Sequence, residues 1–189
     1  MKTIIISQPK AGTYLLSEVL KNCGLTQSYL HLGLKSYTRY HQDRILEGRH
    51  HPEKFRTMVS LDKSVSLVGP GEFAASHLEC SSYTKQCLVD FKKVILTRDS
   101  LELRESWNRF YNGEIRPLRK FDPVKSGKIF DWYGNDNLFG LSFADLTGKN
   151  SEVIDKLQIF LHGEVLTDSK NICDRSLSAD TITKSNIRE

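Results

Sequence analysis

Short apolar runs alternate with amphipathic segments along the chain, and the apolar runs indicate β-strands. The β-branched run at residues 3–7 predicts a buried parallel strand, and residues 93–97 predict a second one. Shorter strands are predicted at 73–77 and 141–146. Strands that alternate with helices predict an α/β fold with three layers (α/β/α), in which helices cover both faces of a mainly parallel central sheet.

Between these strands, apolar residues recur at helical spacing. The spacing predicts helices over 13–23, 82–90 and 100–111, and a final amphipathic helix that begins near residue 151. Residues 26–66 are polar and weakly periodic, which predicts irregular structure with some helix around 40–56. Residues 112–137 hold most of the remaining Gly and Pro and are expected to form loops.

Length and charge narrow the class of protein. A chain of 189 residues suits one domain, which we expect to span residues 1–189. The formal charge of +4 comes from intermixed signs rather than a basic block. This balance favours an anionic ligand over a nucleic acid.

Cysteine usage and hydropathy bear on the compartment. The four cysteines form no CxxC pair and no metal-finger spacing, which indicates reduced thiols in a reducing compartment. The apolar run at residues 4–6 is too short for a signal-peptide core, and no segment reaches the length of a membrane span. We therefore expect a cytoplasmic protein without a membrane partner.

The first candidate site lies between the first strand and the first helix, where the sequence reads PKAGTY. A helix N-terminus offers unpaired N–H groups and a positive dipole end. Gly12 allows the backbone to close around a phosphate, while Lys10 adds a charge and Thr13 a hydroxyl. Two alternatives are a Walker A loop, in which the lysine follows the glycine rather than preceding it, and a plain turn with a solvated lysine.

The second candidate site follows the strand at 93–97. Arg98 stands where this strand ends, at the edge of a parallel sheet where ligands bind, and Ser106 lies two turns into the next helix. A guanidinium lying along that helix could share one phosphate with the serine, because its donors form a planar fork. The alternatives are an ion pair to Asp99 or another carboxylate for the arginine, and a surface hydroxyl for the serine.

Together the two segments resemble the PAPS-dependent sulfotransferase family, which transfers a sulfuryl group from 3'-phosphoadenosine-5'-phosphosulfate (PAPS). The family's PKSGT-type loop grips the 5'-phosphosulfate, and residues 9–13 match it with one conservative change. Its second signature is an arginine at a strand end, followed eight positions later by the serine that helps to hold the 3'-phosphate. The resemblance implies a P-loop-like nucleotide-binding fold and a PAPS site without a metal, formed by these residues: Lys10, Ala11, Gly12, Thr13, Tyr14, Arg98, Ser106 and, in a later basic loop, Lys184.

The resemblance also implies catalytic roles for His77 and Lys10. In cytosolic members a histidine in a Thr-His-Leu context acts as the base, and here the sequence reads Ser76-His77-Leu78. Histidine suits this role near neutral pH. Lys10 would stabilise the departing phosphate. A histidine that only hydrogen-bonds to the backbone remains the alternative for His77.

Three positions depart from the family pattern. Leu15 stands where many cytosolic members have a tryptophan that stacks on adenine, and Ala75 where they often have a lysine. The C-terminal phosphate loop is reduced to residues 181–186. The chain is short for the family, so we expect either a truncated C-terminus or a minimal acceptor domain.

The acceptor is expected to be a small molecule or a glycan with a hydroxyl or an amine, bound by residues 29–56 and 111–133. The remaining histidines lack metal-ligand spacing and are interpreted as surface residues or as lining of the acceptor pocket: His31, His41, His50, His51 and His162. Two other functions stay open. One is a P-loop kinase in which Asp99 binds magnesium, and the other is a non-catalytic domain that binds a nucleotide or a partner protein.

Overall fold

The computed structural model describes residues 1–40, 51–112, 122–123 and 127–176, and within these ranges the chain forms a seven-stranded sheet of order β4-β3-β2-β5-β1-β6-β7. The five neighbouring strands β2, β5, β1, β6 and β7 are parallel to one another. At the edge of the sheet, β3 pairs antiparallel with β2, and β4 pairs antiparallel with β3. The predicted mainly parallel sheet is therefore confirmed. The strands are β1 (Lys2–Ser7), β2 (Thr26–Leu32), β3 (Tyr37–Arg39), β4 (Arg56–Thr57), β5 (Glu72–Ser76), β6 (Phe91–Thr97) and β7 (Leu138–Ser142).

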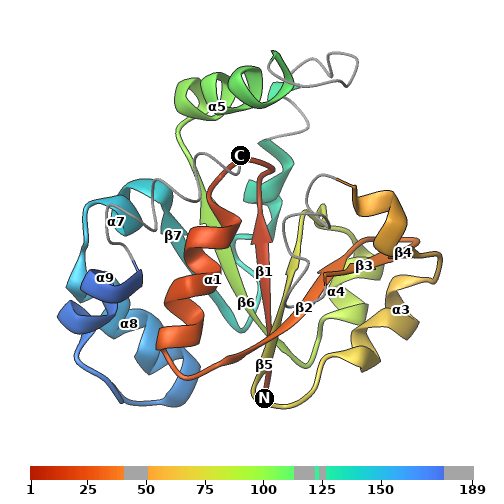
Figure 1. Cartoon of the computed structure of the whole chain (residues 1–189). Helices are drawn as coiled ribbons and strands as arrows, with labels where there is room; N and C mark the ends of the chain where they lie inside the picture. The colour runs from red at the N-terminus through yellow and green to blue at the C-terminus, as the bar shows by residue number, and fades with distance from the viewer. Residues whose placement is uncertain (41–50, 113–121, 124–126, 177–189) are drawn as a thin grey trace.

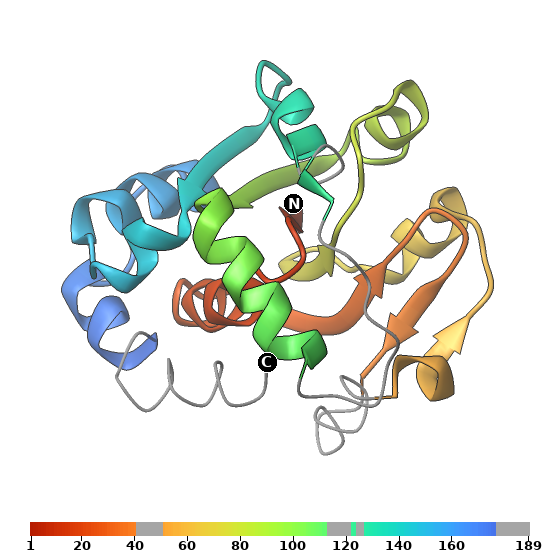
Figure 2. The ribbon, with the colours of Figure 1, turned by 90° about the horizontal axis from the view of Figure 1, so that it is seen from above.

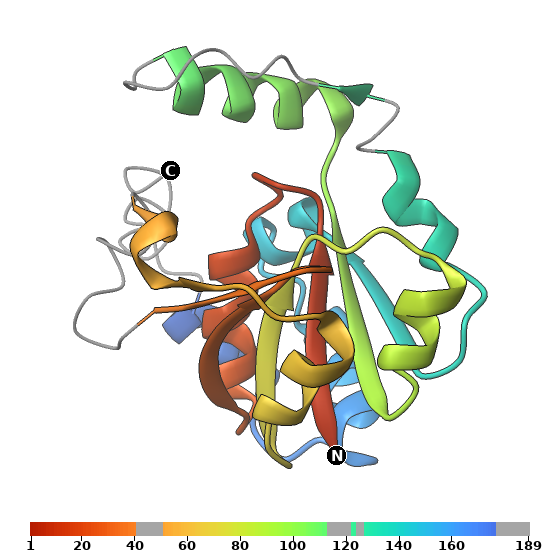
Figure 3. The ribbon, with the colours of Figure 1, turned by 90° about the vertical axis from the view of Figure 1, so that its right-hand side faces the viewer.

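Helices cover both faces of the sheet, which confirms the three-layer prediction (Figure 1). Helices α1, α7, α8 and α9 lie on one side, and α3 and α4 on the other. Helix α5 lies beyond the carboxyl ends of the parallel strands, and it crosses over the sheet when viewed from that end (Figures 2 and 3). The helices are α1 (Thr13–Asn22), α3 (Leu61–Ser64), α4 (Ser82–Cys87), α5 (Ser100–Asn112), α7 (Phe143–Thr147), α8 (Ser151–His162) and α9 (Ser169–Ser176), with short 3-10 helices η2 (Pro52–Phe55), η3 (Val65–Leu67) and η4 (Lys128–Trp132).

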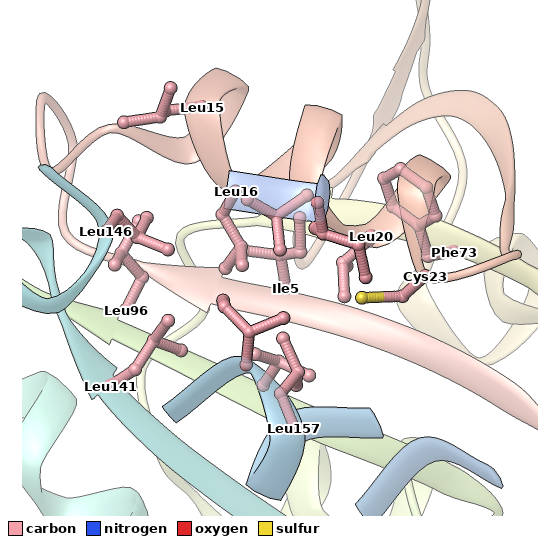
Figure 4. Packing of buried hydrophobic residues seen from close by; sticks show 14 of the residues in the cluster. Ile5, Leu15, Leu16, Leu20, Cys23, Phe73, Leu96, Leu141, Leu146 and Leu157 are labelled. Carbon is pink, nitrogen blue, oxygen red and sulfur yellow. The ribbon is translucent and has the colours of Figure 1, made fainter. Parts of the chain in front are cut away.

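Strand β1 supplies apolar side chains to two separate cores. Ile5 packs with Leu16 and Leu157 on the face covered by α1 and α8 (Figure 4). Ile4 and Ile6 belong to the core on the opposite face. All three isoleucines are completely buried, as expected for a central strand of a parallel sheet, because successive side chains point to opposite faces.

The prediction of irregular structure at 26–66 was wrong for its first part, which forms β2 and β3. Strand β2 opens with polar residues, and its register against β5 shifts between Gln27 and His31. This bulge contains Tyr29 at a φ of 57°. The bulge interrupts the alternation of apolar and polar residues, so the strand carries no readable period of two. The expected helix around 40–56 lies mostly outside the described residues, and η2 is the described remainder.

The strand predicted at 141–146 is displaced, because β7 ends at Ser142 and α7 follows directly. The Ser142 hydroxyl accepts a hydrogen bond from the Asp145 amide at 3.1 Å, and the Asp145 carboxylate accepts one from the Ser142 amide at 2.8 Å. This capping box turns the chain from strand to helix within one residue. Helix α9 was not predicted, and the part of 112–137 that the structure describes contains η4.

The remaining strand and helix predictions are confirmed, with α4 ending three residues earlier than expected. Asp99 and Asn150 cap α5 and α8. The Asp99 carboxylate accepts from the Leu101 and Glu102 amides, and the Asn150 side chain accepts from Val153. Across the described ranges, no helix is both long and apolar enough to cross a membrane.

Gln158 holds the connection between α8 and α9. Its completely buried side chain donates to the Thr167 carbonyl oxygen at 2.7 Å and to the Ser169 hydroxyl at 2.8 Å. Its carbonyl oxygen accepts from the amides of Leu166 and Thr167. One buried amide side chain therefore satisfies polar groups of the α8–α9 connection, whose residues 163–168 are exposed.

We expect Gln158→Leu to lower the free energy of unfolding by about 2–4 kcal/mol, because the hydrogen bonds from its side chain to the α8–α9 connection are lost. Lys156→Ala is the matched control on the same helix, since its ion pair with Glu152 is exposed and screened by solvent, and its loss should change stability little. Urea unfolding of both variants measures the difference. Equal losses in the two variants would contradict this role of Gln158.

Candidate active site

The loop between β1 and α1 wraps its backbone around the start of the helix. The Ala11 amide donates to the Gln8 carbonyl oxygen at 3.1 Å, which closes the turn. Lys10 has a φ of 69°, and Gly12, the N-cap of α1, has a φ of 97°. Gly12 has no side chain with which to cap the helix, and the first turn of α1 contains no acidic residue. The first N–H groups of α1 therefore form a positive, anion-binding end.

Arg98 brings the second candidate site to this loop. It lies directly after β6, which pairs with β1, and its Nη1 donates to the Lys10 carbonyl oxygen at 3.1 Å. Its backbone amide donates to the side chain of the buried Gln8. The Nε atom pairs with Glu102 one turn along α5, so the expected carboxylate pairing exists with Glu102 rather than Asp99. The side chain is 9% exposed, and these two side-chain bonds use two of the five N–H donors of the guanidinium.

Phe143, the first residue of α7, packs against both candidate sites. The Arg98 guanidinium lies over its ring at 3.9 Å from the centroid. A Cβ atom on Gly12 would come within 2.6 Å of the same ring. The loop can therefore approach Phe143 only because residue 12 is a glycine, and the ring packs against both the loop and the arginine. The sequence reading missed this residue because it placed 141–146 in a strand.

His77 follows the last residue of β5, next to the end of β1. Its Nδ1 lies 2.8 Å from the Ser7 carbonyl oxygen, which can only accept, so Nδ1 carries the proton. The Ser7 hydroxyl contacts Nδ1 at 3.3 Å and the Thr13 hydroxyl at 2.6 Å. Ser7 thereby links the histidine to the phosphate-type loop. In this tautomer Nε2 has a free lone pair and can act as a base.

The surroundings keep His77 neutral. The residue retains a solvent-exposed surface, yet neighbouring protein desolvates the ring and lowers its pKa below the ordinary 6.5. The charge of Lys10 lowers this pKa further, while the hydrogen bond to Ser7 acts in the opposite direction. A neutral imidazole at neutral pH is the form that a general base requires.

The other predicted site residues occupy varied positions. Ala11, Gly12 and Thr13 are buried in the loop, and Tyr14 is half-buried on the first turn of α1. Ser106 is 3% exposed on α5, eight residues beyond Arg98. Lys184 lies outside the described residues. The structure thus brings Lys10, the loop, Arg98 and His77 to one edge of the sheet, and a phosphate at Ser106 stays a prediction.

Several predicted surface histidines have other surroundings. His162 is half-buried, and its Nε2 donates to the Cys23 carbonyl oxygen at 2.8 Å, which ties the end of α8 to the end of α1. His51 is exposed beside Glu53, as expected. His41 and His50 lie outside the described residues. Within the described ranges, no three His, Cys, Asp or Glu side chains come together to hold a metal ion.

No model of a protein family matches the chain, and no curated protein matches its sequence. Solved structures do match. Mouse sulfotransferase SULT7A1 complexed with PAP matches with a TM-score of 0.58 and 14% identity, over 96% of this chain and 66% of that one. Retinol dehydratase with androsterone and the inactive cofactor PAP has a TM-score of 0.57 and 16% identity, over 97% and 66% of the two chains.

The sulfotransferase domain from the curacin biosynthetic pathway matches with a TM-score of 0.53 and 15% identity, over 89% of this chain and 75% of that domain. This chain has the sulfotransferase fold. The fold implied by the sequence resemblance is therefore confirmed. The chain spans 66% of the length of the first two sulfotransferase-fold structures.

In this sulfotransferase fold, we expect Gly12→Ala to cost more stability than Gly24→Ala. Both glycines have a positive φ, but a Cβ at Gly24 meets nothing within 4 Å. Both variants pay about 1–2 kcal/mol for the left-handed conformation. Gly12→Ala must also displace the Phe143 ring, which adds about 1–3 kcal/mol. Urea unfolding measures both losses.

The additional loss should shrink in a Phe143→Ala background, because the clash is then absent. Equal losses for the two glycine variants would show that the close approach of Gly12 to Phe143 is not a constraint.

Proposed function

We propose that this protein transfers a sulfuryl group from PAPS to a hydroxyl or amine of a small-molecule or glycan acceptor. One observation carries this proposal: a phosphate-type loop, an arginine and a neutral histidine meet at the carboxyl edge of three adjacent parallel strands. The Arg98–Lys10 contact at 3.1 Å joins the first two, and the His77–Ser7 contact at 2.8 Å joins the third. In open parallel sheets this edge binds ligands.

The two cationic segments suit the two ends of the nucleotide. Lys10 and the N–H groups at the start of α1 would bind the 5'-phosphosulfate, through charge and the helix dipole. Arg98, with Ser106 on α5, would bind the 3'-phosphate. Leu15 is completely buried in the core, so adenine has to be held by other apolar contacts.

The reaction follows from these positions. The acceptor oxygen or nitrogen attacks sulfur and forms the new bond to it, while the bond between sulfur and the bridging phosphate oxygen breaks. Nε2 of His77 takes the proton of the acceptor. The negative charge that develops on the departing adenosine 3',5'-bisphosphate is stabilised by Lys10 and by the N–H groups of Gly12 and Thr13. Binding of the remote 3'-phosphate by Arg98 positions the sulfate for attack.

The similar structures support this choice of donor and acceptor. SULT7A1 and retinol dehydratase were crystallised with PAP, and retinol dehydratase also with retinol or androsterone. A kinase fits the site less well. The lysine precedes the glycine in the loop, and the Asp99 carboxylate already accepts two amide hydrogen bonds as a helix cap.

Adenosine 3',5'-bisphosphate should raise the melting temperature more than AMP or ATP with magnesium, because only the bisphosphate engages both segments. Arg98→Ala should weaken bisphosphate binding about tenfold to a hundredfold, as loss of a charged hydrogen bond predicts. It should weaken AMP binding less, because AMP loses only the support that Arg98 gives to the Lys10 loop. Arg104→Ala, exposed on the same helix, is the control. A wild-type protein that prefers ATP with magnesium would favour the kinase instead.

His77→Ala should lower kcat by at least about a hundredfold while it still binds adenosine 3',5'-bisphosphate, since a general base contributes to chemistry rather than to donor binding. In the wild type, kcat/KM should fall as His77 becomes protonated, with a midpoint below pH 6.5 because its folded pKa is lowered. Steady-state rates from pH 4.5 to 8 measure both effects. His162→Ala, at the end of α8 and away from the site, serves as the control. Turnover of His77→Ala within a few fold of wild type would exclude this base.

A further inference from the structure

A second imidazole, that of His31 on β2, lies directly against His77. The ring centroids are 4.6 Å apart and the ring planes are inclined by 60°, so the edge of one ring meets the other. His31 was interpreted from the sequence only as a surface or acceptor-pocket residue. In the structure it is half-buried and touches the histidine to which we assign proton removal.

The bulge in β2 creates this contact. Within the bulge, the Ser28 hydroxyl donates to the Phe73 carbonyl oxygen at 2.8 Å and accepts from the Leu30 amide. Tyr29 takes a left-handed conformation that residues other than glycine adopt at a cost. Beyond the bulge His31 pairs with Ala75, two residues before His77 and on the same face of β5. The bulge thus directs the His31 side chain toward His77, and bulges beside active sites commonly reorient a side chain in this way.

The pair stays uncharged near neutral pH. Desolvation, and then the neighbouring His77 and Arg56, lower the pKa of His31 to about 3. Arg56 on β4 lies in register with His31, because His31 pairs with Thr38 of β3 and Thr38 pairs with Arg56. Lys10 is the charged group that faces His77 from the loop after β1. His31 therefore presents a neutral ring to a neutral ring, without a repulsive charge.

We propose that His31 is a positioning residue that packs against the His77 ring and holds it with Nδ1 toward the Ser7 carbonyl oxygen and Nε2 toward the acceptor. This proposal rests on the proposed function of His77 as the base. His77 lies outside the hydrogen-bonded part of β5, which ends at Ser76. Among the described residues, the hydrogen bonds of the ring run from Nδ1 to Ser7, at 2.8 Å to its carbonyl oxygen and 3.3 Å to its hydroxyl. A half-turn of the ring would replace Nδ1 by a carbon and break both. Contact with His31 restricts that rotation.

The role depends on the shape of the ring and not on its nitrogen atoms, and two substitutions separate these properties. His31→Phe keeps a flat ring against His77, whereas His31→Ala removes it. His31→Leu keeps most of the side-chain volume without a flat ring, and it replaces His31→Ala in the tests if the alanine variant does not fold. His162→Ala, at the end of α8 and away from the site, controls for the loss of an imidazole elsewhere.

NMR of the imidazole nitrogens in the protein without ligand gives the first readout. In wild type and His31→Phe, we expect His77 to keep its proton on Nδ1 and to titrate with the same midpoint. In His31→Ala or His31→Leu, the ring should exchange between tautomers and its titration midpoint should rise toward 6.5, because solvent reaches it. An unchanged tautomer and midpoint in His31→Ala and His31→Leu would overturn the proposal.

Steady-state kinetics give the second readout. His31→Ala should lower kcat about tenfold or more, with the KM for PAPS unchanged, because a misplaced base slows chemistry and leaves donor binding intact. His31→Phe should stay within about threefold of wild type. If His31→Phe loses as much kcat as His31→Ala, a ring nitrogen is required and the positioning role is wrong. The NMR readout needs no turnover, so failure of the sulfuryl-transfer proposal is seen separately, as absent activity with a normal His77 titration.

Discussion

The contact between Arg98 and the backbone of the β1–α1 loop is the constraint on which the site depends. β1 and β6 are neighbours in the sheet, so the residues that follow them are brought to the same edge by strand pairing alone. The hydrogen bond from Arg98 to the Lys10 carbonyl oxygen then fixes their separation, and the Phe143 ring fixes their orientation. The structure therefore holds two cationic segments side by side at one edge of the sheet, as the proposed binding of two phosphates of one nucleotide requires.

The sequence was sufficient for the parts of the fold where one local signal dominates. β1 and β6 are buried on both faces and read as continuous apolar runs, and α8 has both an apolar stripe and a capping asparagine. It was also sufficient for Lys10, Gly12 and Arg98, because each stands at the end of such a clear strand or at the start of a helix. The structure confirms that these three residues converge. Their binding roles remain predictions.

The sequence did not reveal the parts of the site that depend on tertiary pairing. β2 contains a bulge, so its pattern has no constant period, and His31 could not be assigned a neighbour. Phe143 belongs to a helix that starts one residue after a strand, a boundary set by the Ser142–Asp145 capping box rather than by hydrophobic pattern. The hydrogen bond of Ser7 to His77 joins residues 70 positions apart, which no local pattern encodes.

The proposed site therefore divides into two halves: the residues proposed to bind phosphate, held by many contacts, and the histidine proposed to accept the proton, held by fewer. The phosphate half consists of backbone N–H groups and a largely buried arginine, all fixed by the sheet and by close packing at Gly12. The proton-accepting half is one partly exposed histidine beyond the end of β5, held by a carbonyl oxygen on one side and by His31 on the other. Because charge stabilisation depends on preorganised dipoles, whereas proton transfer depends on the orientation of one ring, small changes near β2 should affect the chemistry while the nucleotide site stays intact.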